Sequence, residues 1–319
     1  MAAGQSGGRW EMGSGRGVLR ISISVILAFA VLGVMFGLLS GSFAIVFDGV
    51  YSLIDASMTA VALLVANLIA TFTAGDLRNK RLVERFTMGF WHLEPIVLGV
   101  TGVLLTGAAV YALISAIDSF MTGGRELRFG HAVVYSALTL TTCLVMWVFQ
   151  TRANRRIGSA FVALDAKGWL MAALLAAALL FAFAGGMLVE GTRWAQVAPY
   201  IDPAVLALVC VVIIPMPLGT IRQALKDILL VTPPDLKEHV DAVARQVVQR
   251  YGFIDHRAYV ARVGRGRQIE LVFIVPPNGP ARTVEEWDGL RERISEALGG
   301  DEANRWLTIE FTADPDWAN

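Results

Sequence analysis

The stretch Asp48-Gly-Val-Tyr-Ser-Leu-Ile-Asp55 lies inside an apolar run from Ser42 to Thr73, in which the two aspartates are the only charged residues. A run of this length predicts a helix that crosses a membrane. Placing a carboxylate near the middle of a bilayer costs about 2.5–3.5 kcal/mol on insertion scales. Each of the two aspartates therefore needs a partner residue, a proton, water or an ion to offset this cost. The helical period places Asp48, Ser52 and Asp55 on one stripe, with Tyr51 beside it. These oxygens suit a divalent cation, and we predict a site there.

The whole chain has the composition of an integral membrane protein. Of its 319 residues, 55% are hydrophobic and only 17% are charged. Six apolar runs are long enough for a hydrocarbon core of about 30 Å, and they lie at residues 21–40, 43–73, 95–121, 131–150, 158–186 and 201–225. The first run is too long for the core of a signal peptide and has no small-residue cleavage site after it. We therefore expect an all-α membrane domain of about six transmembrane helices over residues 1–231.

Basic residues gather on one side of these predicted spans. That side holds Arg9, Arg16, Arg20, Arg78, Lys80, Arg81, Arg85, Arg152, Arg155, Arg156, Arg222 and Lys226, and the other side holds Arg125, Arg128 and Arg193. Short loops that are rich in Lys and Arg stay in the cytoplasm. The bias predicts a multi-pass protein of the cell (inner) membrane, surrounded by lipid, with both termini in the cytoplasm.

The last part of the chain predicts a small cytoplasmic domain over residues 232–319. The prolines of Thr232-Pro-Pro-Asp235 end the last span. The residues that follow predict a helix over 236–251 and two β-rich segments around the turn Gly264-Arg-Gly266. A helix over 284–298 and a strand over 306–311 complete the predicted domain. The order αββαβ indicates a two-layer, ferredoxin-like α+β domain, which is small enough to gain from pairing with a second copy.

Charge and motifs exclude several classes of protein. Residues 1–231 hold 16 Lys and Arg against 12 Asp and Glu, whereas residues 232–319 hold 11 against 15. This acidic tail argues against nucleic acid as a partner. Cys143 and Cys210 lie far apart in apolar runs, so we interpret them as small core residues. No nucleophile–base pair, phosphate-binding Gly loop or HExxH motif appears, so we do not expect an enzyme.

The chain resembles the cation diffusion facilitator family along nearly its whole length. The resemblance rests on the six spans with cytoplasmic ends, the αββαβ tail, the motif D-G-x-x-S-x-x-D of the second span, and the loop from Arg85 to Glu94-Pro95. It implies a homodimeric exporter that moves divalent transition metals out of the cytoplasm in exchange for protons. It also implies a tail that dimerises and often binds metal. The divalent cation would be a transported substrate, and we expect no resident cofactor.

The chain departs from this family at the metal ligands. Members that carry zinc usually have His or Asp four residues before the second-span Asp, where this chain has Tyr51. They also place His and Asp four apart in the fifth span, and these positions align with Gly168 and Ala172. Only Asp55 of the usual four ligands remains, so a zinc-type tetrahedral site is not present as the family builds it. The His-rich cytoplasmic loop is missing too, and the tail keeps only His239 and His256 as possible soft ligands.

Several charged residues have two interpretations each. Asp165, about two turns closer to the cytoplasm than the ligand level, is either the first ligand met by an incoming ion or a cap at the interface. Lys167 either extends to the head groups or neutralises a carboxylate such as Asp55. Asp48 is either a ligand or a hydrogen-bond partner of a neighbouring helix. Glu94 is a site residue or complements the dipole of the helix it begins.

The sequence leads to one preferred function and one alternative. The preferred function is proton-coupled efflux of a divalent cation, with Asp55 as the central ligand and with Asp48, Ser52, Tyr51 and Asp165 adding oxygen atoms. Oxygen ligands favour Mn²⁺, Mg²⁺ or Fe²⁺ over Zn²⁺, but the sequence does not distinguish among these ions. The alternative is a non-transporting or regulatory member of the family whose site is degraded.

Overall fold

The computed structural model describes residues 15–73, 84, 86, 89–157, 160–189, 192–300 and 304–318. The chain divides into two compact units. The first unit comprises Met1–Thr59 and Val103–Leu218, and the second comprises Ala60–Gly102 and Gly219–Asn319. The second unit therefore contains the end of the second span and the beginning of the third span together with the C-terminal domain. Arg9, Arg78, Lys80, Arg81 and Arg85, which the orientation argument used, lie outside the described residues.

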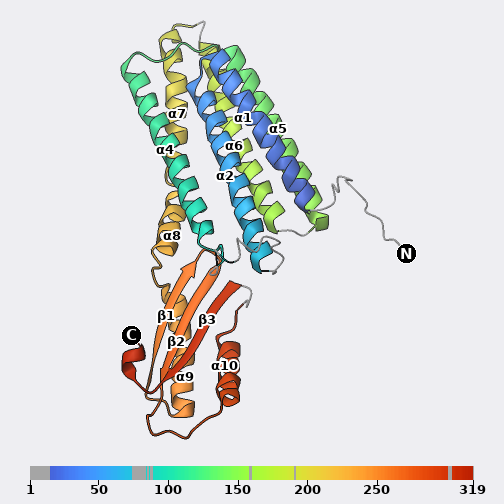
Figure 1. The fold of residues 1–319 in the computed structure, drawn as a ribbon. Coiled ribbons are helices and arrows are strands. Elements are labelled where there is room, and N and C mark those ends of the chain that lie inside the picture. The colour runs from blue at the N-terminus through green and yellow to red at the C-terminus, as the bar shows by residue number, and fades with distance from the viewer. Residues whose placement is uncertain are drawn as a thin grey trace, which may run out of the picture. The chain divides into compact units, whose positions relative to one another are not determined.

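The described residues contain six segments that are long and apolar enough to cross a membrane, which confirms the predicted number. Their helices are α1 (Gly15–Ser40), α2 (Phe43–Thr73), α4 (Leu93–Met121), α5 (Phe129–Ile157), α6 (Ala160–Val189), and α7 (Ile201–Ile213) with α8 (Leu218–Ile228), as Figure 1 shows. The short 3-10 helix η1 (Ala195–Tyr200) precedes α7. The last predicted span is thus two helices rather than one. Pro215 and Pro217 lie in the intervening turn, because proline cannot continue the backbone ladder of a helix.

The first unit is a packed bundle whose helices approach one another through small residues. Its core includes Ile45 and Phe183, which are fully buried. At Gly37, an added Cβ would lie 2.5 Å from the side chain of Val46, and at Gly49 it would lie 2.8 Å from the carbonyl oxygen of Ala30. Such close approaches are typical of helix pairs in membranes, where van der Waals packing stabilises helix association and the hydrophobic effect does not. The glycines therefore bring α1 and α2 together beside the aspartates.

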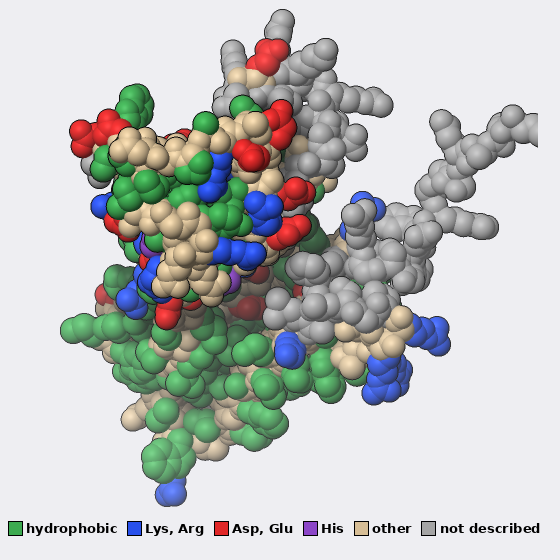
Figure 2. Space-filling model, turned by 90° about the horizontal axis from the view of Figure 1, so that it is seen from below, with side chains coloured by type: hydrophobic (Ala, Val, Ile, Leu, Met, Phe, Trp, Pro, Cys, Tyr) green, Lys and Arg blue, Asp and Glu red, His purple; other side chains and the backbone are tan. Residues whose placement is uncertain are grey.

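Large hydrophobic side chains cover much of the helical surface. Leu188, Phe181 and Leu64 are at least 70% exposed, and many other apolar residues of the spans are also exposed. Figure 2 shows a field of hydrophobic side chains that contrasts with a region where acidic and basic side chains are mixed. A surface this apolar is unfavourable in water but suits the hydrocarbon of a bilayer. The surface thus agrees with the membrane assignment.

The C-terminal domain has the predicted αββαβ order. It consists of α9 (Pro234–Tyr251), β1 (Asp255–Val263), β2 (Gly266–Ile274), α10 (Val284–Leu298), β3 (Arg305–Thr312) and the short helix η3 (Pro315–Ala318). β1 and β2 form an antiparallel hairpin, and β3 pairs parallel to β2 after the crossover through α10. One face of the sheet contributes Leu271 and Phe273 to a core that also contains Val240, Leu290 and Ile294. A capping box of Thr283 and Glu286 begins α10.

Candidate metal site

A cavity of about 370 Å³ lies within the first unit and collects all five predicted site residues. Its walls come from α1, α2, α5 and α6. The residues that line it are Ile26, Phe29, Asp48, Tyr51, Ser52, Asp55, Tyr135, Thr139, Cys143, Asp165, Gly168, Trp169, Ala172, Leu175, Ala176 and Leu179. The stripe expected on α2 therefore faces one shared space, and Asp165 of α6 reaches the same space.

Asp48 has a partner on a neighbouring helix. The Tyr135 hydroxyl of α5 donates a hydrogen bond of 2.9 Å to Oδ2 of Asp48, and Tyr135 is only 2% exposed. Gly33 of α1 makes room for this contact, because a Cβ there would lie 2.7 Å from the Tyr135 hydroxyl oxygen. Asp48 is thus a hydrogen-bond partner of a neighbouring helix, as the second of its two interpretations predicted. A carboxylate has several acceptor positions, so this bond leaves it capacity for an ion.

Asp55 is more accessible than Asp48. Its side chain is exposed in the single chain, and within the described residues it makes no hydrogen bond or ion pair. Gly168 and Ala172, which align with the ligands of the family, also line the cavity but bring no donor atoms. Within the described ranges, no three His, Cys, Asp or Glu side chains come together as a metal site. Binding there would therefore need hydroxyl groups or water beside the carboxylates.

Asp165 is held by a buried amide that the sequence analysis did not identify. Nε2 of Gln150 donates a hydrogen bond of 2.6 Å to Oδ2 of Asp165, and Gln150 is fully buried. The Oε1 atom of Gln150 has no hydrogen-bond partner in the part of the chain that the structure describes. Lys167 is exposed and forms no ion pair with Asp55 among the described residues, which favours its interpretation as a residue that extends toward head groups.

Asp202 is a second polar residue that the sequence analysis missed. It lies in the first turn of α7 and is only 1% exposed. Its carboxylate accepts hydrogen bonds from the Ser42 hydroxyl, from the Phe43 backbone N–H at 3.0 Å and from the Ala44 backbone N–H at 3.4 Å. These donors form the start of α2, where backbone N–H groups have no partner inside the helix. Asp202 thus fixes the end of the helix that carries Asp48 and Asp55.

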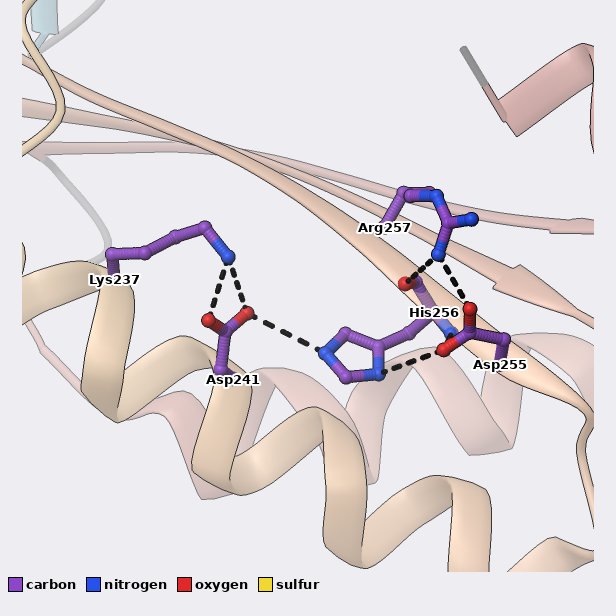
Figure 3. A network of polar contacts seen from close by, with 5 residues as sticks. All are labelled: Lys237, Asp241, Asp255, His256 and Arg257. Atoms are coloured by element: carbon purple, nitrogen blue, oxygen red, sulfur yellow. Dashed lines mark hydrogen bonds and ion pairs between the residues drawn. The ribbon is translucent and has the colours of Figure 1, made fainter.

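The two histidines of the C-terminal domain are engaged in different contacts. His256 lies between two carboxylates, with Nε2 3.4 Å from Asp241 and Nδ1 4.0 Å from Asp255, as Figure 3 shows. Lys237 also pairs with Asp241 at 2.6 Å. The backbone N–H of His256 and the guanidinium of Arg257 lower the pKa of Asp255 below its usual value. His239 instead lies 3.1 Å from the carbonyl oxygen of Leu298. The network joins α9 to β1.

Glu94 forms a specific ion pair rather than acting only on the helix dipole. Nε of Arg265, in the β1–β2 turn, donates to Glu94 at 2.8 Å, and Nη2 donates to the other carboxylate oxygen at 3.2 Å. All of these atoms belong to the second unit. The hydrogen bonds to Glu94 raise the pKa of Arg265. His92 and His131 are exposed and do not line the cavity.

Comparisons with known proteins agree with this architecture. A sequence profile described as the cation efflux transmembrane domain matches residues 19–229, which is more than half of the chain. A "Cadmium, cobalt and zinc/H(+)-K(+) antiporter" from Bacillus velezensis is 27% identical over 202 residues, or 61% of this chain and 59% of that protein. The "Magnetosome protein MamB" from Magnetospira sp. is 25% identical over 133 residues, or 42% of each chain. The chain thus spans less than two thirds of the length of either relative.

Proposed function

The chain belongs to the cation efflux family, and from this we propose that it exports a divalent metal cation through the cavity between α1, α2, α5 and α6. Members of this family are transporters rather than enzymes, so the expectation that the chain is not an enzyme is confirmed. The observation that carries the proposal is the convergence of Asp48, Ser52, Asp55 and Asp165 on one cavity inside a six-span protein. Carboxylates in the hydrocarbon region are costly, and a bound cation would compensate for that cost.

The proposed mechanism exchanges the cation for protons at the carboxylates. Asp165 meets the cation first, and Asp55 then binds it with the oxygens of Ser52 and Tyr51, while Asp48 receives it beside Tyr135. A carboxylate must lose its proton before it binds a metal ion, so binding releases protons and dissociation allows their return. A proton gradient that protonates Asp55 would then drive the cation out. The name of the antiporter relative, which includes H(+), supports this coupling.

The cell (inner) membrane, cytoplasmic termini and a homodimeric assembly are further parts of this proposal. The basic residues on one side of the spans support the orientation. The small size of the C-terminal domain supports pairing with a second copy. Because both of its histidines have other contacts, we propose that this pairing needs no metal.

The first prediction tests Asp55 as the central ligand. Asp55→Asn keeps the side-chain volume but removes the charge and the titrating proton, so it should abolish proton-driven divalent-cation flux. Asp48→Asn should weaken the flux by a smaller factor, because Tyr135 already satisfies part of that carboxylate. Both are measured in proteoliposomes with a metal-sensitive dye inside and an imposed pH gradient, using Zn²⁺, Mn²⁺, Fe²⁺ and Mg²⁺ in turn.

Asp118→Asn is the matched control, since Asp118 is an exposed aspartate on α4 that does not line the cavity. It should carry cations at the wild-type rate. Wild-type flux in Asp55→Asn would overturn the assignment of the site. A wild type that carries none of these cations would favour the regulatory alternative, which the absence of donor atoms at Gly168 and Ala172 also supports.

A further inference from the structure

Helix α5 contributes a polar face to the cavity. Tyr135, Thr139 and Cys143 follow one another at intervals of four, so they lie on one face of the helix. All three line the cavity. The positions on α6 where the family places its ligands are Gly168 and Ala172, which have no donor atoms. α5 therefore adds polar side chains to a cavity that already holds the α2 stripe and Asp165 of α6.

Thr139 and Cys143 are the two side chains of this face that do not bond to Asp48. The Thr139 hydroxyl interacts with the hydroxyl of Tyr135, but its buried oxygen makes no hydrogen bond of normal geometry to any residue that the structure describes. A buried hydroxyl without a well-formed hydrogen bond is less stable by about 1–3 kcal/mol, so the Thr139 oxygen has capacity for a further partner. Cys143 is only 3% exposed and is a free thiol that borders the cavity. Tyr135, the third, already bonds to Asp48 and connects this face to α2.

We propose that Thr139 and Cys143 of α5 complete, with Asp48 of α2, a binding site for a thiol-preferring divalent transition-metal ion such as Zn²⁺, Co²⁺ or Cd²⁺. This inference rests on the proposed function and narrows its substrate class. A carboxylate and a thiolate together balance the two positive charges of the ion, and sulfur favours these metals over Mg²⁺ and Mn²⁺. As the Sγ–metal bond forms, the thiol proton leaves to water in the cavity. The oxygen-only preference drawn from the sequence would then not hold at this position.

The chain offers a matched control because it has two cysteines. Cys210 is fully buried among the core residues of the first unit and does not line the cavity. The purified protein is titrated with Cd²⁺, and the ultraviolet charge-transfer band of a cadmium–thiolate bond is recorded. We expect the band in the wild type and in Cys210→Ser, and its loss in Cys143→Ser. A band that survives in Cys143→Ser and disappears in Cys210→Ser would overturn the proposal, as would its absence from the wild type.

Two neighbouring variants test whether the thiol belongs to a built site. Thr139→Val and Asp48→Asn keep Cys143 but remove a donor, so each should weaken Cd²⁺ binding about tenfold or more. Thr142→Val is the control for Thr139→Val, because Thr142 lies on the same helix but does not line the cavity. Unchanged affinity in both Thr139→Val and Asp48→Asn would show a reactive thiol rather than a site and would overturn the proposal.

Transport separates failure of this inference from failure of the proposed function. In proteoliposomes, Cys143→Ser should lose Zn²⁺ and Cd²⁺ flux relative to Mn²⁺ flux. If it keeps the wild-type ratio while Asp55→Asn is inactive, this inference fails and the export function stands. If Cd²⁺ binds to Cys143 as expected but the wild type moves no cation, the site stands and the export function fails.

Discussion

Asp48, Asp55 and Asp165 border one cavity, but each meets different surroundings. Asp48 accepts a hydrogen bond from a tyrosine, Asp165 accepts one from a buried amide, and Asp55 is exposed. The Gln150 amide must direct its N–H toward Asp165, because a carboxylate accepts and cannot pair with the amide oxygen unless it is protonated. This orientation fixes the carboxylate that an ion from the cytoplasm is proposed to meet first. Gln150 is therefore a positioning residue in the proposed mechanism.

Replacing Gln150 tests this positioning. Gln150→Met keeps a similar length but removes the hydrogen bond to Asp165, so we expect the half-saturating cation concentration to rise about tenfold, with a smaller effect on the maximal rate. The measurement is a concentration series in proteoliposomes. In the Asp165→Asn background the same change should add little, because residues that act through one another are not additive. Equal effects of Gln150→Met in both backgrounds would mean that Gln150 does not act through Asp165.

At the scale of elements, α2 depends on a residue from the other end of the membrane domain's sequence. Ser42 and Asp202 are 160 positions apart, yet their side chains are hydrogen-bonded at the beginning of α2. The bonds satisfy backbone N–H groups that would otherwise lack partners within the helix. They also tie α2 to α7, so that the stripe of Asp48, Ser52 and Asp55 is held at one height in the bundle. An N-terminal cap here is supplied by tertiary structure.

Removing this cap should destabilise the first unit. Asp202→Ala leaves the Ser42 hydroxyl and two backbone N–H groups unpaired, and we expect a loss of about 2 kcal/mol or more. Asp202→Asn keeps one acceptor and should lose less. The apparent midpoint of thermal unfolding in detergent measures both. Asp118→Ala serves as the control, because Asp118 is an exposed aspartate on α4. A midpoint for Asp202→Ala that equals the control would refute the capping role.

At the scale of the whole molecule, the second unit connects the beginning of α4 to the C-terminal domain. The tip of the β1–β2 hairpin lies against residues that precede or begin α4. Gly264 has φ of 60°, and an added Cβ would lie 3.1 Å from Glu94; at Gly266 it would lie 2.8 Å from the ring of Trp91. The turn thus needs glycines both for its conformation and for the close approach. The two hydrogen bonds from the Arg265 guanidinium to the Glu94 carboxylate form the polar part of this contact.

Charge reversal should open this contact, and a double reversal should restore it. Arg265→Glu places two carboxylates together, so hydrogen exchange should accelerate in the hairpin and in residues 89–95. Arg265→Glu combined with Glu94→Arg should return exchange toward the wild-type rate. Because Arg265 is 41% exposed, the pair is worth only about 1 kcal/mol or less. Arg245→Glu, an exposed residue of α9 outside the hairpin, is the control. Identical exchange in the wild type and Arg265→Glu would mean that the ion pair does not hold the hairpin.

Local sequence patterns were sufficient to predict the helices and strands and the wall of the cavity that α2 forms. Hydrophobic runs identified the six spans, and the period of two or of 3.6 identified the αββαβ order of the tail. The helical period also placed Asp48, Tyr51, Ser52 and Asp55 together, because residues within two turns keep their spacing in any fold that contains the helix. Pro215 and Pro217 marked the break in the last span, although the sequence analysis treated it as continuous.

The sequence by itself determined the membrane class, the order of the helices and strands, and the carboxylate stripe of α2, because these follow from interactions between near neighbours in the chain. Only the tertiary structure decided which groups meet that stripe. Asp48 and Tyr135 are 87 positions apart, and no periodicity links residues on separate helices. The polar face of α5, the Gln150 amide and the Asp202 cap become site residues through the way the helices pack. Close packing at glycines such as Gly33 and Gly49 determines which side chains are in contact. These contacts depend on how all the helices fit together, which no local sequence pattern contains.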